Sequence, residues 1–273
     1  MSSVYISGAR PHALSAGWQE VIGGIANWRI AHLLGIGELR RRYARSRLGQ
    51  FWLVASTGIT VGVLGVVWSM LWKMSLEDML PYIAIALILW SLITGTLGEA
   101  PMVLIAATPI FLNQGVSFST VVFALVYRQL LIFLHNTTIA ALTLLVFQRP
   151  LGPEAFLALP GLLLLVVNLA WSAHLIAMAC SRFRDLAPVV ANLLVVGFFI
   201  TPVFWQESQI SAEHYWLISF NPLATLLSLV RDPILGKVPP TSSWLSAILL
   251  AILGSFATIL LIGRFRRKII YWL

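Results

Sequence analysis

The chain has 273 residues, of which 59% are apolar and only 10% carry a charge. So few polar side chains cannot cover a soluble protein of this length, so the composition predicts a membrane protein with several spans. In a soluble chain the formal charge of +8 would suggest nucleic-acid binding, but here it has to be compared with the positions of the spans. Cys180 is the single cysteine and the five histidines are scattered, which argues against disulfide, redox and metal chemistry.

The first predicted element is an amphipathic helix that precedes the spans. Its apolar residues recur every three or four positions, with polar residues on the other faces. This pattern is typical of a helix lying in the cytoplasmic membrane interface, and a helix packed on a partner protein is the alternative. The apolar positions are Trp18, Val21, Ile22, Ile25 and Trp28.

An arginine-rich stretch, "ELRRRYARSRLGQFW", follows the helix and leads into the first span. One interpretation is a positively charged anchor that touches anionic lipid at the cytoplasmic face. The other is that planar guanidinium groups bind a phosphate or pyrophosphate headgroup bidentately. Nucleic acid is disfavoured because the stretch adjoins a span and no recognition fold accompanies it. The candidate pyrophosphate ligands are Arg40, Arg41, Arg42, Arg45 and Arg47.

Six apolar runs are long enough to be considered as transmembrane helices, which need roughly 20 residues to cross about 30 Å of hydrocarbon. They are too continuously apolar for barrel strands, so we expect an all-α membrane protein. Residues 1–49 then form a cytoplasmic N-terminal segment, and residues 50–273 form the transmembrane domain. The predicted spans are 51–72, 80–97, 117–147, 156–180, 188–205 and 244–263.

Arg128 is the single basic residue inside a predicted span. Facing lipid would cost it several kcal/mol, so we expect it to face protein or a wet cavity. Its partner is expected to be Glu99 or a substrate phosphate.

Two cytoplasmic connections, "GEAPMVLIAATPIFLNQG" and "SRFRDLAP", are short enough to form small helices that dock on a partner. Between the fifth and sixth spans, "YWLISFNPLATLLSLVRDPILG" is apolar but interrupted by Pro222 and Pro233. Neither half is long enough to span, which favours a re-entrant pair of short helices turned at Asn221 and Pro222 in the outer leaflet. A folded external loop is the alternative.

The distribution of lysine and arginine predicts the orientation. Seven arginines precede the first span, two lie between the fourth and fifth spans, and four basic residues follow the sixth. The opposite face has four basic residues: Lys73, Arg149, Arg231 and Lys237. Six spans place both termini on one side, and the excess of basic residues predicts that this side is cytoplasmic.

Aromatic residues are more numerous than interface anchoring requires, with 11 tryptophans and 14 phenylalanines. Lining of a transport channel and ordinary membrane-belt or helix packing both remain open for these residues. The candidates are Trp52, Trp68, Trp72, Tyr82, Trp90, Phe198, Phe199, Phe204 and Trp205.

The sequence contains no motif for nucleotide hydrolysis or acid–base catalysis. It lacks a GxxxxGK[ST] loop, because Lys237 after Gly236 is followed by Val238. The paired carboxylates near a span are Glu77 and Asp78, and adjacent residues on a helix do not face each other. We therefore expect a transport subunit rather than an enzyme.

Four segments in this order, "RRRYARSRLGQFW", "LPYIAIALILW", "ITPVFW" and "NPLATLLSLVRDPILG", resemble signatures of the permease subunit of ABC exporters for lipid-linked polysaccharides. The resemblance extends over about residues 38–273. The stretch "LGQFWLVASTGITVGVLGVVWSMLWKM" is more similar to the O-antigen branch than to the capsule branch.

This resemblance implies a homodimer of six-span subunits in the bacterial inner membrane, bound to two copies of a separate ATPase. The complex would export an undecaprenyl-pyrophosphate-linked glycan past aromatic belts, and the aromatic candidates named above would line this glycan channel. Flat aromatic faces can stack on the apolar faces of sugars without a fixed hydrogen-bond register, so a polymer could slide past them. ATP and Mg²⁺ would be bound by the ATPase, and this chain would hold no cofactor. Candidate residues for coupling to the ATPase are Glu99, Arg182, Arg184 and Asp185.

Two rival classes remain at this point. One is an ABC permease for another substrate, such as teichoic acid, capsule, haem or a drug. The other is a membrane-embedded acyl- or glycosyltransferase, which should show clustered His, Asp or Glu at the membrane surface. The sequence shows no such cluster.

Overall fold

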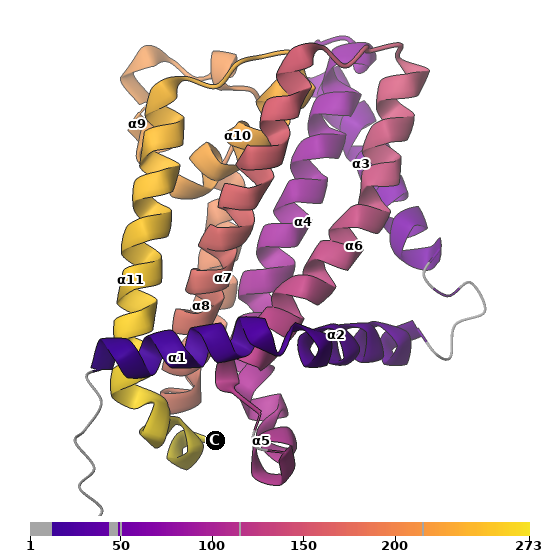
Figure 1. The fold of residues 1–273 in the computed structure, drawn as a ribbon. Helices are drawn as coiled ribbons and strands as arrows, with labels where there is room; N and C mark the ends of the chain where they lie inside the picture. The colour runs from indigo at the N-terminus through magenta and orange to yellow at the C-terminus, as the bar shows by residue number, and fades with distance from the viewer. Residues whose placement is uncertain (1–12, 44–48, 50, 115, 215) are drawn as a thin grey trace, which may run out of the picture.

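The apolar runs of the sequence form long helices that stand side by side in the computed structural model (Figure 1). The structure describes residues 13–43, 49, 51–114, 116–214 and 216–273. Over these residues all elements are α- or 3-10 helices, which confirms the all-helical prediction.

Five helical segments are long and apolar enough to cross a membrane in the described part of the chain. They are α3 (Phe51–Trp72), α4 (Leu76–Ala106), α6 (Phe118–Val146), Pro153–Arg182 (η1, Pro153–Leu157, continuing into α7, Ala158–Arg182) and α11 (Thr241–Trp272). The predicted boundaries are nearly correct for the first, third and fourth spans. They are too short for the second and sixth, because α4 and α11 continue well beyond the apolar runs.

The predicted fifth span is helical over only part of its length. Helix α8 (Leu186–Ile200) has 15 residues and extends about 22 Å at 1.5 Å per residue, less than the hydrocarbon thickness. Thr201 is already extended, with φ −95° and ψ 136°, because the residue before a proline is disfavoured in helical conformation. The chain therefore continues from α8 as a non-helical segment.

The N-terminal amphipathic element consists of two helices, α1 (Ala13–Ala26) and α2 (Trp28–Tyr43), where one was expected. Both run across the lower end of the long helices in Figure 1. The buried face of α1 carries small residues, because a Cβ at Gly17 would meet the carbonyl of Ile259 in α11. Trp18, Ile22 and Ile25 are exposed on the other side, as an interfacial helix requires.

Helix α4 lies at the centre of the bundle and packs against α3, α6, α7 and α8. Its buried residues include Ile83, Ile88, Leu89, Leu92 and Ile93. Ser75 caps its first turn by accepting a hydrogen bond from the backbone N–H of Asp78, although Pro81 and Pro101 interrupt its hydrogen-bond ladder. Most of α4 is thus fixed by neighbours on all sides.

Shorter helices complete the two ends of the bundle. Helix α5 (Thr108–Gln114) follows α4 at the lower end of Figure 1. The segment after α8 contains η2 (Glu207–Gln209), η3 (Ala212–His214), α9 (Trp216–Ser219) and α10 (Pro222–Ile234) at the upper end. The predicted turn is present, since Asn221 caps α10 by accepting hydrogen bonds from the N–H groups of Leu223 and Ala224. The first helix of the predicted pair has only four residues.

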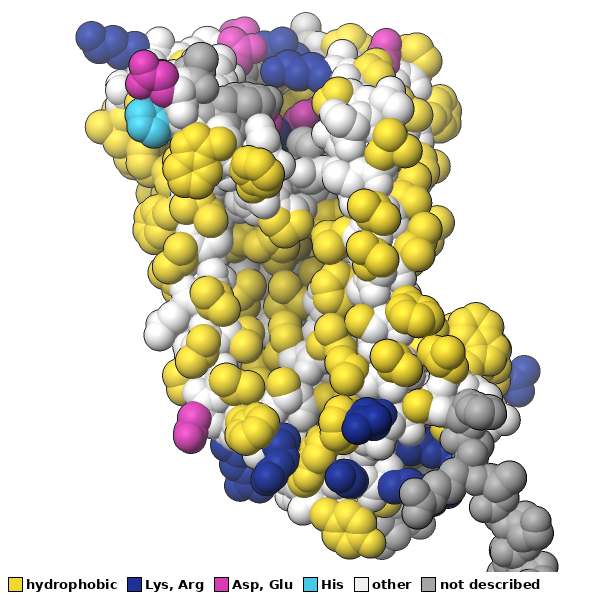
Figure 2. Space-filling model, turned by 90° about the vertical axis from the view of Figure 1, so that its left-hand side faces the viewer, with side chains coloured by type: hydrophobic (Ala, Val, Ile, Leu, Met, Phe, Trp, Pro, Cys, Tyr) yellow, Lys and Arg dark blue, Asp and Glu magenta, His cyan; other side chains and the backbone are white. Residues whose placement is uncertain are grey.

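Charged side chains gather at the two ends of the molecule. Figure 2 shows Lys and Arg side chains concentrated at the lower end, beneath a broad band of apolar side chains. That end carries α1, α2 and the C-terminus in Figure 1. The arrangement is that expected of a protein whose apolar band faces lipid.

Candidate functional site

Most of the predicted aromatic residues come together in one group, contributed by α3, α4, α8 and the segment after α8. We call six of them, joined by ring contacts, the aromatic cluster. Within it Trp68 stacks on Phe204 with 4.7 Å between ring centroids, and Phe198 lies 5.2 Å from Phe204 and 5.7 Å from Trp90. The members are Trp68, Trp72, Trp90, Phe198, Phe199 and Phe204.

The aromatic cluster has a buried base and an exposed side. Trp90 and Phe204 are buried, whereas Phe199 is 61% exposed and Trp72 is also exposed. The buried rings hold their neighbours by edge-to-face and offset contacts, which aromatic rings favour over direct face-to-face stacking. The cluster can therefore present aromatic faces at the surface of the chain while its base remains fixed.

Trp52 lies apart from the aromatic cluster. It is exposed in the first turn of α3, sixteen residues before Trp68, which corresponds to about 24 Å along the helix axis. The candidates Tyr82 and Trp205 lie beside the cluster and contribute polar contacts. The Tyr82 hydroxyl lies 2.8 Å from the carbonyl oxygen of Trp205, and the Trp205 indole N–H donates to the carbonyl of Phe199 at 3.1 Å.

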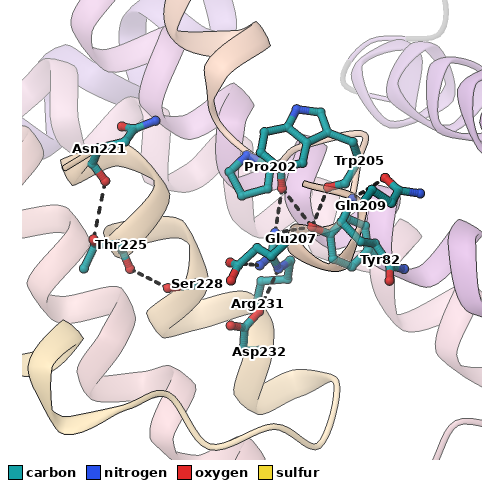
Figure 3. Close-up of polar contacts among 11 residues, drawn as sticks. Tyr82, Pro202, Trp205, Glu207, Gln209, Asn221, Thr225, Ser228, Arg231 and Asp232 are labelled. Atoms are coloured by element: carbon teal, nitrogen blue, oxygen red, sulfur yellow. Dashed lines mark hydrogen bonds and ion pairs between the residues drawn. The ribbon is translucent and has the colours of Figure 1, made fainter. Parts of the chain in front are cut away.

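A buried arginine holds the segment that carries Phe204 and Trp205. The side chain of Arg231, in α10, is only 2% exposed. Its Nη1 donates to the Tyr82 hydroxyl and to the carbonyl of Pro202, both at 2.6 Å (Figure 3). Its guanidinium carbon also lies 4.5 Å from the centre of the Tyr82 ring.

Two carboxylates balance the charge of Arg231. Its Nε donates to Asp232 at 2.8 Å, and its Nη2 lies 3.6 Å from Glu207 (Figure 3). Asn221, at the start of α10, adds a second attachment by donating to the Thr201 hydroxyl at 2.9 Å. The non-helical segment after α8 is therefore fixed to both α4 and α10.

This role of Arg231 was not predicted from the sequence, in which it was only a basic residue expected on the external face. A signal was present, because Arg231 and Asp232 interrupt an otherwise apolar segment between two prolines. The partners Tyr82 and Pro202 were not predictable, since they are far from Arg231 in the sequence.

A second polar cluster lies at the opposite end of the bundle. Arg128, in α6, is only 11% exposed and forms ion pairs with Glu38 of α2 and Glu99 of α4. Glu99 also lies 3.3 Å from Arg42 and accepts a hydrogen bond from Gln129 at 3.2 Å. We call Glu38, Arg42, Glu99 and Arg128 the charge network. Of the two partners expected for Arg128, Glu99 or a substrate phosphate, the structure shows the pairing with Glu99.

The predicted pyrophosphate ligands are only partly described by the structure. Arg40, Arg41 and Arg42 occupy the last turn of α2, where their positive charge also suits the helix dipole. Arg45 and Arg47 lie outside the described residues. Of Arg40, Arg41 and Arg42, only Arg42 belongs to the charge network, where it forms an ion pair with Glu99.

The other proposed coupling residues lie at the junction of α7 and α8. Arg182 packs over the rings of Phe183 and Trp272, at 5.3 and 6.0 Å, and Arg184 donates to the terminal residue Leu273 at 3.5 Å. Asp185 precedes α8 without a side-chain capping bond. Glu99 lies elsewhere, in the charge network, so the structure does not bring the four residues into one site.

These helices define an all-α membrane protein with several passes. No family model matches the chain. It is 21% identical over 196 residues to the O-antigen export system permease protein RfbA of Klebsiella pneumoniae, an alignment that covers 71% of this chain and 76% of the relative.

Proposed function

We propose that this chain is the permease subunit of an ATP-driven ABC transporter that exports undecaprenyl-pyrophosphate-linked O-antigen across the bacterial inner membrane. The aromatic cluster is the observation that supports this proposal most directly. Its exposed faces suit the apolar C–H faces of sugars, which can stack without fixed hydrogen bonds. The name of the Klebsiella relative agrees with this substrate class.

The proposed topology has six passes with both termini in the cytoplasm. The fifth pass combines α8 with the extended segment that follows it, and α9 and α10 form the re-entrant pair in the outer leaflet. The gathering of Lys and Arg at the end with α1 and α2 supports a cytoplasmic location for that end.

The transporter requires partners that supply energy and complete the path. Two copies of this chain would surround the glycan, and two ABC ATPase subunits would bind ATP and Mg²⁺ at the cytoplasmic face. Arg182, Arg184 and Asp185 are the proposed contacts with the ATPase, because they lie at the short junction between α7 and α8.

The test compares aromatic residues inside and outside the aromatic cluster in cells that depend on this chain for export. Phe199→Leu and Trp72→Leu remove exposed rings of the cluster, whereas Trp52→Leu removes a ring outside it whose exposure lies between those two. We expect the first two to slow export about three- to tenfold, equivalent to ~0.6–1.4 kcal/mol in the barrier. Trp52→Leu should leave export unchanged.

Surface glycan and cytoplasmic lipid-linked glycan are measured together, with the amount of inserted protein as the reference. Equal effects of all three substitutions would contradict the proposal and indicate ordinary anchoring in the membrane. Accumulation of a teichoic acid, a capsular polymer or a small molecule instead of O-antigen would reassign the substrate. Nucleotide hydrolysis should appear only when an ATPase subunit co-purifies with the chain.

A further inference from the structure

A cavity of about 350 Å³ opens beside the charge network at the basic end of the molecule. Its polar side is formed by Glu38, Glu99 and Arg128. The remaining wall is mostly apolar and is formed by residues of α2, α4, α5 and α6. These apolar residues include Leu34, Met102, Val103, Ile110, Val121 and Leu125.

The cavity combines two chemical surfaces that suit an anionic amphiphile. An apolar chain can lie on the Leu, Val, Ile and Met side chains, and a phosphate can reach the guanidinium group of Arg128 at the polar side. Both terminal nitrogens of Arg128 are paired with carboxylates, and its buried Nε has no hydrogen-bond partner among the described residues. Arg42, whose side chain is more than half exposed, forms an ion pair with Glu99, the carboxylate that also pairs with Arg128.

The charge network is formally neutral, with two arginines and two glutamates. A diphosphate would therefore have to displace a carboxylate to gain a full charge-assisted contact with either arginine. Glu38 and Glu99 are each more than one third exposed, so they can leave a guanidinium group for water at low cost. The carboxylates thus act as internal competitors for the arginines.

We propose that Arg128 and Arg42 bind the diphosphate of a polyprenyl diphosphate in this cavity, and that Glu38 and Glu99 compete with it for their guanidinium groups. This inference rests on the proposed function for the identity of the lipid. It adds Arg128 to the binding site, and it assigns Glu99 a role in headgroup binding. The competition regulates entry of the lipid headgroup, because the diphosphate binds the arginines only when it displaces the glutamate carboxylates.

The proposal makes an unusual prediction about the glutamates. If they only hold the helices together, Glu99→Gln should weaken or not affect ligand binding. If they compete with the ligand, the same substitution should tighten it, because the network gains a net positive charge. Glu38 remains beside Arg128 in this variant, so no buried charge is left without a partner.

The experiment measures binding of farnesyl diphosphate to the purified full chain in nanodiscs of zwitterionic lipid. We expect Glu99→Gln and Glu38→Gln to bind about three- to tenfold more tightly than the parent, where tenfold corresponds to 1.4 kcal/mol. Arg128→Gln should lose binding at least about tenfold, and Arg128→Lys should fall between because it keeps the charge but not the planar fork. Asp78→Asn, in the exposed pair with Arg149 at the opposite end, is the matched control and should bind like the parent.

Further ligands separate the possible sources of the phosphate. Inorganic pyrophosphate and farnesol should each bind more weakly than farnesyl diphosphate, because each satisfies only one surface of the cavity. Equal competition by phosphatidylglycerol would overturn the assignment to a diphosphate lipid and indicate a phospholipid site. Unchanged or weaker binding in a folded Glu99→Gln variant, checked by its thermal unfolding, would overturn the competition.

The binding assay needs neither the ATPase nor export. If the glutamate variants bind more tightly but the chain exports no lipid-linked glycan, the proposed function fails and the site stands. If the chain exports the glycan but the glutamate variants do not tighten binding, the site fails and the function stands.

Discussion

The guanidinium group of Arg231 is taken out of water, and its partners are a hydroxyl, a carbonyl and two carboxylates. Such a group is costly to bury and costly to remove once its partners are arranged around it. Its contacts join α4, α10 and the segment before η2, three parts of the chain that are separate in the sequence. Arg231 is therefore a positioning residue for Phe204 and Trp205.

Arg231→Met should destabilise the fold by about 3 kcal/mol, the lower end for breaking a buried ion pair, because Glu207 and Asp232 are partly exposed. Thermal unfolding in detergent measures this change. Arg149→Met breaks an ion pair exposed on both sides and should cost less than ~1 kcal/mol. A similar loss in both variants would show that the burial of Arg231 contributes little.

At the scale of the helices, the sequence predicts which spanning helices exist better than it predicts where each helix ends. Runs of apolar residues identify the spans because only a helix can cross lipid with its backbone satisfied. The runs end before their helices do, since α4 continues to Ala106 and α11 continues through its basic residues to Trp272. Helix formation beyond the apolar run is decided by backbone hydrogen bonding, which tolerates arginine and lysine well.

The candidate sites were predictable from the sequence only where local patterns, rather than contacts between distant residues, determine them. Composition identified the aromatic residues, and α8 supplies two neighbouring members of the cluster, so part of their grouping follows from local sequence. The contacts of Arg231 with Tyr82, 149 residues away, depend on how α10 packs, and no local pattern encodes them. Arg128 was the exception, because an isolated charge in a span requires a partner and few carboxylates are near.

The crossing of α1 over α11 gives a sharp test of helix packing. A Cβ at Gly17 would meet the carbonyl of Ile259, and one at Gly263 would meet the carbonyl of Ala13. Gly17→Ala should therefore destabilise the fold by about 1–3 kcal/mol through overpacking. Gly23, in the same helix, has nothing within 4 Å of a Cβ, so Gly23→Ala should be neutral or stabilise by up to ~1 kcal/mol.

Thermal unfolding of the two alanine variants checks this difference in sign. A change in unfolding free energy of the same sign in both variants would mean that α1 does not dock on α11 through its small residues. The exposed Trp18, Ile22 and Ile25 suit a helix in the membrane interface, so detachment of α1 from α11 should leave the insertion of the remaining helices intact.

For the molecule as a whole, two of the helices that carry the aromatic cluster, α3 and α8, bury few of their residues. Val61 and Gly65 are the buried residues of α3, and Gly197 is the buried residue of α8. In contrast, α4 is buried along most of its length. A second copy of the chain placed against α3 and α8 would enclose the aromatic cluster between two subunits, which is the arrangement that a path for a glycan requires.

Cross-linking in membranes can test this arrangement, because Cys180 is buried and can be replaced by serine to give a background without cysteine. In that background, Phe199→Cys should give a dimer with a bifunctional maleimide, since the cluster would face its copy across the shared path. Leu245→Cys, on the exposed side of α11, is matched in exposure and should remain monomeric. Efficient cross-linking at Leu245 with none at Phe199 would place the contact between subunits on α11 and leave the aromatic cluster facing lipid, where it could not line a path between two copies.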